Sequence, residues 1–198
     1  MPIIKPIYHF LLLAVAVSLG MVCLYIDVNV FHNGLSELSV TEIVQEAILF
    51  AIAMIWLTLA RRQKEYRERN ILTAGFFTAM LFRELDAFFD LIAHGSWVWF
   101  SLLAAASAIA CAMKNRRHVP GQVMDYTAHT TYGMMSAGLI CILVFSRLFG
   151  LHIFWQDVMQ GEYIRIVKNI VEEETELFGY ILCLTSSVLY LLENKARS

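Results

Sequence analysis

The chain has 198 residues, of which 59% are hydrophobic and 16% are charged, whereas a soluble domain has roughly 45–50% and 25%. The net charge of −2 gives no electrostatic basis for binding nucleic acid, and this apolar composition, with only three prolines, excludes a disordered chain. We therefore expect an integral membrane protein whose immediate partners are membrane lipids. Protein partners stay open.

The apolar segments predict six transmembrane helices. A helix needs about 20 mostly apolar residues to cross a bilayer, and six stretches fit, although the second, third and sixth contain carboxylates. They lie at about residues 7–27, 40–60, 71–93, 97–113, 126–149 and 169–192. Because no linker divides the chain, we expect an all-α polytopic membrane protein, a bundle of six helices forming one domain over residues 1–198.

The distribution of lysine and arginine predicts the orientation of these helices. Eleven such residues lie in the two termini and in the loops that follow the second and fourth segments, three lie on the opposite side, and Arg83 lies inside a segment. Cytoplasmic loops carry the excess of positive charge. We expect a multi-pass protein of the cytoplasmic, or inner, cell membrane, with both termini in the cytoplasm and the first segment retained as a helix.

Ionisable residues inside the predicted helices are the main functional signal. At 3.6 residues per turn, Arg83, Asp86, Asp90 and His94 share one face of the third segment. The predicted topology places them in the outer half of the membrane, at the depth of acids from the second and sixth segments. Such residues are costly in lipid and commonly mark functional sites.

The first interpretation of this signal is an outward-facing metal or cation site. Oxygen and nitrogen ligands from facing helices can form a metal centre in the core of a bundle. The expected ligands come from three helices and are Glu46, Asp86, Asp90, His94, Glu173 and Glu176. The spacing favours a divalent ion without identifying it, and no Glu-x-x-His or His-Glu-x-x-His motif supports a di-iron or zinc-protease centre.

Two alternatives stay open. The same carboxylates could relay protons or ions in a small transporter, or they could serve only structure by pairing with Arg83 and Arg147. We expect Arg83 to bond to an acid of the second or sixth segment, with Glu46 and Glu176 favoured. Whether the protein is an enzyme is left open.

Three local patterns complete the expectations. His94-Gly95-Ser96 predicts a tight turn between two helices. The run of small residues from Ala104 to Ala112 predicts a face for close helix packing. The charged segment from Arg61 to Arg69 is interpreted as the positive-inside signal, with possible contact to anionic lipid.

Overall fold

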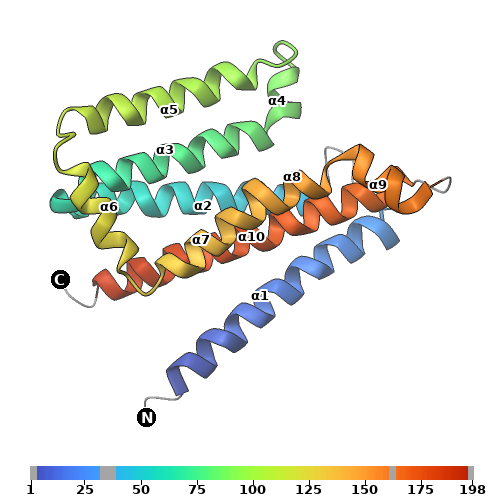
Figure 1. The fold of residues 1–198 in the computed structure, drawn as a ribbon, viewed down its shortest axis with the longest axis horizontal. Helices are drawn as coiled ribbons and strands as arrows, with labels where there is room; N and C mark the ends of the chain where they lie inside the picture. The colour runs from blue at the N-terminus through green and yellow to red at the C-terminus, as the bar shows by residue number, and fades with distance from the viewer. Residues whose placement is uncertain (1–3, 32–38, 161–163, 196–198) are drawn as a thin grey trace. The chain divides into compact units, whose positions relative to one another are not determined.

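The computed structural model describes residues 4–31, 39–160 and 164–195. The protein is all-α: 87% is helical, and the described residues contain no strand. In chain order (Figure 1) the elements are α1 (Ile4–Asn29), α2 (Val40–Arg62), the 3₁₀ helix η1 (Lys64–Tyr66), α3 (Arg67–Glu84), α4 (Asp86–Asp90), α5 (Trp97–Met113), α6 (Val119–Thr127), α7 (Tyr132–Ile140), the π-helix η2 (Cys141–Phe145), α8 (Ser146–Phe149), α9 (His152–Met159) and α10 (Arg165–Lys195).

The apolar helices are those of a membrane protein. Among the described residues, four segments are long and apolar enough to cross a bilayer, and they are Ile7–Asn29, Val40–Arg62, Tyr132–Phe149 and Arg165–Asn194. Trp97–Met113 is apolar but shorter. The expected third span is divided, because α3 ends at Glu84 and α4 begins at Asp86. The count of six spans therefore stays a prediction.

The chain forms two compact units. Unit 1 comprises Met1–Gln45 and Ser136–Thr185, and unit 2 comprises Glu46–Met135 and Ser186–Ser198. Three helices, α2, α7 and α10, contribute residues to both units. The expectation of a single domain over the whole chain stays a prediction, and each unit is described by itself.

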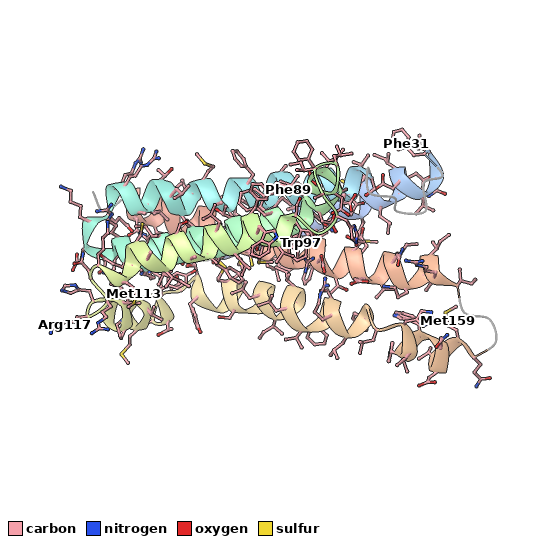
Figure 2. All side chains as sticks on the ribbon, turned by 90° about the horizontal axis from the view of Figure 1, so that it is seen from above. Phe31, Phe89, Trp97, Met113, Arg117 and Met159 are labelled. Carbon is pink, nitrogen blue, oxygen red and sulfur yellow. The ribbon has the colours of Figure 1, made fainter. Side chains whose placement is uncertain are left out.

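In unit 2, α3 and α5 run side by side and are joined through α4 (Figure 1). The two helices approach so closely that a Cβ atom on Gly75 would collide with the side chain of Ala108, and Ser101 Oγ donates to the carbonyl of Ala79 at 3.0 Å. At the end marked by Phe89 and Trp97 (Figure 2), the ring of Phe89 stacks on Phe100 with centroids 4.5 Å apart. These contacts confirm the small-residue face predicted for Ala104 to Ala112.

The turn between α4 and α5 is the tight turn predicted at His94-Gly95-Ser96. Gly95 has a φ of 75°, which a side chain would disfavour.

The start of the fifth apolar helix differs from the prediction, since α7 begins at Tyr132 instead of near residue 126. The cause is local: Thr131 accepts the backbone N–H of Met135 with its carbonyl, and its hydroxyl bonds to His129 Nδ1 at 3.0 Å, so a new helix starts there.

Arg69 ends the charged segment that we interpret as the positive-inside signal, but its side chain is buried in unit 2. Its Nη2 lies 2.7 Å from the hydroxyl of Tyr190 and 2.8 Å from Asn70 Oδ1. Its guanidinium also lies within 4.8–6.0 Å of four aromatic ring centroids, those of Trp56, Tyr66, Tyr126 and Tyr190. A guanidinium is weakly hydrated and stacks well on aromatic rings, so it can be buried here.

In unit 1, α10 packs against α7 and η2 through two glycines. A Cβ atom on Gly138 would lie 2.7 Å from the carbonyl oxygen of Gly179, and one on Gly179 would lie 2.8 Å from that of Gly138. Helix α1 meets α10 at Gly20, where a Cβ atom would be 3.1 Å from Leu177 Cδ2. The glycines thus permit close helix contacts of the kind that membrane proteins favour.

Candidate functional site

The six expected ligands fall into both units. Glu46, Asp86, Asp90 and His94 belong to unit 2, whereas Glu173 and Glu176 belong to unit 1. Within the described residues, the structure contains no group of three or more His, Cys, Asp or Glu side chains arranged to hold a metal ion. The convergence of all six residues stays a prediction.

In unit 2, the structure brings Asp90 and His94 together. His94 Nδ1 lies 2.7 Å from Asp90 Oδ2, and the backbone N–H of Gly95 donates to Asp90 Oδ1 at 2.7 Å. The side chain of His94 is 98% exposed, and Asp86 is also exposed. The contacts of Asp90 therefore close the turn that leads to α5.

Arg83 contacts its neighbour in the sequence. Its Nη2 lies 2.6 Å from Glu84 Oε1, and the side chain of Glu84 is largely buried. Consecutive residues lie about 100° apart around a helix, and the long side chain of Arg83 reaches around the helix to Glu84. The expected pairing of Arg83 with Glu46 or Glu176 stays a prediction.

In unit 1, the first half of α10 carries a cluster of four carboxylates, the half-buried Glu172, Glu173 and Glu174 and the buried Glu176. Its innermost member is Glu176, which is 1% exposed. The guanidinium of Arg147 forms an ion pair with Glu176 Oε1, and Ser146 Oγ donates to the same oxygen at 3.0 Å. Because α8 supplies both partners, Glu176 connects α8 to α10.

The π-helix η2 explains why Ser146 and Arg147 face α10. A π-turn adds one residue to the helical repeat, so the residues after it are rotated about the helix axis relative to those before it. Gly138 precedes η2 and faces α10, and Ser146 and Arg147 follow η2 and also face α10. The local geometry thus keeps one face of this segment on α10.

Two further contacts extend the cluster towards the start of α10. Lys168 Nζ lies 2.6 Å from Glu172 Oε2, and Arg147 Nη2 lies 3.6 Å from Glu172 Oε1. The carboxylate of Glu172 also lies so close to Gly150 that a Cβ atom there would be 2.5 Å from Glu172 Oε1. Glu172 and Glu176 therefore share the charge of Arg147, and Lys168 compensates Glu172 further.

Gln45 connects α2 to the same cluster and is fully buried. Its Nε2 donates to the carbonyl of Glu173 at 3.0 Å and to Glu173 Oε2 at 3.2 Å. Both partners are acceptors, which fixes the orientation of the amide. Gln45 Oε1 is buried, and no donor reaches it from the described residues. Such an oxygen calls for an explanation, because buried polar atoms are normally satisfied.

Asp27 brings α1 to the start of α2. Its Oδ1 accepts the backbone N–H of Val40 at 2.7 Å, and its Oδ2 accepts both the N–H and the hydroxyl of Thr41, at 2.9 and 2.7 Å. This carboxylate therefore satisfies N–H groups that a helix start leaves without intrahelical partners. Its negative charge also suits the positive end of the α2 dipole.

A cavity of about 440 Å³ lies between α1 and α10. Aliphatic side chains of both helices form most of its wall, and Glu174 and Thr175 are its polar lining residues. Glu174 Oε1 is buried and lacks a hydrogen-bond partner among the residues that the structure describes. A carboxylate in such surroundings favours a proton or a bound cation over a bare charge.

Several of these residues have no distinct signal in the sequence. Asp27 only ends the first expected span, and Lys168 only adds to the charge of the predicted outer side. The spacing Ser39-x-x-Glu42, with Ser39 Oγ accepting the N–H of Glu42 at 3.1 Å, is the signal that locates the start of α2.

No protein-family model, curated protein or solved structure matches this chain.

Proposed function

We propose that this membrane protein binds a cation at the carboxylate cluster of unit 1, with Gln45, Glu173 and Glu174 as ligands. The observation that carries the proposal is Gln45 Oε1, a fully buried oxygen without a donor among the described residues. Its own Nε2 holds Glu173, so the oxygen is fixed in place beside an acid-rich helix face. A bound cation would satisfy this oxygen and would offset the surplus of negative charge.

The charges of the cluster support this proposal. Asp27, Glu172, Glu173, Glu174 and Glu176 belong to unit 1, where Arg147 forms ion pairs with Glu172 and Glu176 and Lys168 forms one with Glu172. Close carboxylates cannot all stay ionised in a medium of low dielectric constant unless cations compensate them. Arg147 and Lys168 pair with Glu172 and Glu176, whereas Glu174 Oε1 is buried without a hydrogen-bond partner among the described residues, so Glu174 is suited to bind an additional positive charge.

The type of donor indicates the class of cation. Amide and carboxylate oxygens suit hard ions such as Mg²⁺, Ca²⁺ and Mn²⁺. Of the residues expected from the sequence, Glu173 and Glu176 belong to this cluster. The expectation that Glu46, Asp86, Asp90 and His94 bind a cation stays a prediction.

The test is cation binding by the purified full-length protein. After treatment with a chelator, thermal unfolding in detergent is followed during titration with CaCl₂, MgCl₂ and MnCl₂. We expect a rise in the melting temperature and a dissociation constant that weakens about tenfold or more in Gln45→Met and Glu173→Gln, because each variant removes one oxygen ligand or its charge. Asp157→Asn, at an exposed residue of α9, is the matched control. If no cation raises the melting temperature, the cluster serves structure alone.

A second candidate function is proton-coupled transport, and Glu174 favours it. A buried carboxylate oxygen without a described partner is a place where a proton can reside, and it faces the cavity between α1 and α10. In proteoliposomes, a transmembrane pH gradient should then dissipate faster with the native protein than with Glu174→Gln. Equal rates would remove this alternative and leave cation binding untouched.

We also propose that the protein crosses the cytoplasmic membrane six times with both termini inside. The excess of Lys and Arg in the termini and in the loops after the second and fourth segments supports this topology. In a cysteine-free background, His94→Cys and Asp157→Cys should react with an impermeant maleimide in intact cells, and Arg117→Cys only after permeabilisation. If His94→Cys behaves like Arg117→Cys, then α3, α4 and α5 do not cross the bilayer and only four helices span it.

A further inference from the structure

We propose that unit 2 contains a binding site for the phosphate-bearing headgroup of an acidic phospholipid. The site is a pocket of about 500 Å³ at the point where α2 ends and η1 and α3 begin. Three cationic residues line it, Arg61, Lys64 and Arg67, and this trio is called the basic pocket below. The site is independent of the carboxylate cluster, and nothing in the proposed function requires it.

The change of direction between α2 and α3 creates the pocket. Arg61 belongs to the last turn of α2, Lys64 opens η1, and Arg67 is the first residue of α3. The three side chains are exposed, and they form no hydrogen bond or ion pair with any residue in the described part of the chain. Their donors are therefore available to a ligand, and guanidinium groups match phosphate oxygens in geometry.

The acid that lines the pocket does not neutralise this trio. Glu68 also lines the pocket, but its Oε1 accepts Asn115 Nδ2 at 2.7 Å and its Oε2 accepts Gln122 Nε2 at 2.8 Å. Arg69, the next cation in the sequence, is turned into the aromatic core. Three cations thus face one carboxylate that has its own partners, which leaves the basic pocket positive and suited to an anion.

The apolar part of the wall favours a lipid over a free anion. Leu57, Ala60 and Ile71 line the same pocket as the cations. The apolar segment Val40–Arg62 ends at this point, so the pocket lies where a membrane helix leaves the hydrocarbon region. A phospholipid offers both a phosphate for the cations and an apolar glycerol and acyl region for this wall. Basic pockets at this depth are typical sites for anionic headgroups.

The test compares lipids with the free anion on the purified full-length protein in detergent micelles. Thermal unfolding is followed during separate titrations with phosphatidylglycerol, phosphatidylcholine and inorganic phosphate. We expect phosphatidylglycerol alone to raise the melting temperature, with an apparent dissociation constant about thirtyfold weaker in Arg61→Gln/Arg67→Gln, the change expected on losing two cations near a membrane surface. Arg116→Gln/Arg117→Gln is the control, because it removes the same charge from exposed residues that do not line the pocket.

Each other outcome overturns the proposal. If inorganic phosphate gives the same stabilisation and the same loss in Arg61→Gln/Arg67→Gln, the ligand is a soluble phosphate. If the control weakens binding equally, the effect is one of net charge. A measurement without variants adds a check: stabilisation by phosphatidylglycerol should fall as NaCl rises, since salt screens exposed cations. Stabilisation by phosphatidylcholine to the same extent would show that the headgroup is not recognised.

Discussion

Arg147 and Glu176 form an ion pair of unequal burial: the side chain of Arg147 is 46% exposed and that of Glu176 is 2% exposed. The two partners therefore differ in what happens when one is lost. Without Glu176, the guanidinium can be hydrated where it stands. Without Arg147, a buried carboxylate remains inside unit 1 and loses its ion pair, while the hydrogen bond from Ser146 stays in place.

This asymmetry predicts unequal effects of two neutralising substitutions. Arg147→Gln should lower the free energy of unfolding by about 3 kcal/mol, because it removes the guanidinium that pairs with a buried carboxylate. Glu176→Gln should cost about 1 kcal/mol, because its amide can still accept the hydroxyl of Ser146. The double variant should be more stable than Arg147→Gln alone. Equilibrium unfolding of the purified protein, with detergent micelles and an added denaturing detergent, measures all three.

Arg165→Gln serves as the control for Arg147→Gln, since Arg165 is an exposed residue at the start of α10. Its effect should stay within about 0.5 kcal/mol, as is usual for surface substitutions. Equal losses for Arg147→Gln and Glu176→Gln would contradict the asymmetry.

The sequence predicted the helices better than it predicted their polar contacts. Hydropathy located the long apolar helices, because about 20 apolar residues leave little choice in a bilayer. It could not predict the break at Leu85 or the π-helix at Cys141–Phe145, since neither has a proline or glycine to mark it. Helical periodicity placed Asp86, Asp90 and His94 on one face, but it could not show that Asp90 and His94 close a turn.

The burial of charged residues is the second feature that the sequence could not predict. Arg69 and Arg67 look alike in a run of charges, yet Arg69 is buried among aromatic rings from segments distant in the sequence, whereas Arg67 lines an open pocket. Only the fold brings Tyr126 and Tyr190 to Arg69. Asp27 is similar: its role depends on the position of Val40 and Thr41, which spacing along the chain does not fix.

The contact of Gly138 with α10 predicts a sharp difference between two glycines of α7. Gly138→Ala should destabilise the protein by about 1–3 kcal/mol, because the new methyl group would meet Cys183 Sγ and the carbonyl of Gly179, each at 2.7 Å. Gly133→Ala, in the first turn of the same helix, meets nothing within 4 Å and should be neutral or stabilise by less than about 1 kcal/mol through helix propensity. Equilibrium unfolding compares them, and a neutral Gly138→Ala would show that α7 and α10 can move apart at no cost.

The contacts of Arg69 predict that lysine cannot replace arginine at this position without a loss of stability. Arg69→Lys should lower the free energy of unfolding by about 2 kcal/mol, although it keeps the charge, because an ammonium group cannot reach Asn70 and Tyr190 together or stack on the rings. Near-ultraviolet circular dichroism should change as well, since Trp56 and Tyr190 stack with centroids 5.3 Å apart beside this guanidinium. Arg62→Lys, at an exposed residue, should change neither signal. Parent-like stability of Arg69→Lys would mean that charge alone holds the core of unit 2.

Glu68 predicts how unit 2 responds to acid. The hydrogen bonds from Gln122, and then from Asn115, lower the pKa of Glu68 from its ordinary value of 4.5. A carboxyl group whose folded-state pKa is depressed contributes stability above its unfolded-state pKa and loses it as the pH falls through the folded-state pKa. Near pH 7, the contribution of Glu68 to the free energy of unfolding should therefore not change with pH. Below pH 4.5 this contribution should decrease.

Glu68→Gln isolates this contribution. At pH 7 the variant should be less stable than the parent by about 2 kcal/mol, the range for hydrogen bonds to a charged group. As the pH falls below 4.5 the two proteins should converge, because the parent carboxylate becomes protonated and loses the same charge-assisted bonds. Free energies of unfolding measured from pH 3 to pH 7 provide the comparison, with Glu65→Gln as an exposed neighbour that should follow the parent curve. A gap between parent and Glu68→Gln that stays constant across this range would show that Gln122 and Asn115 do not favour the ionised form of Glu68.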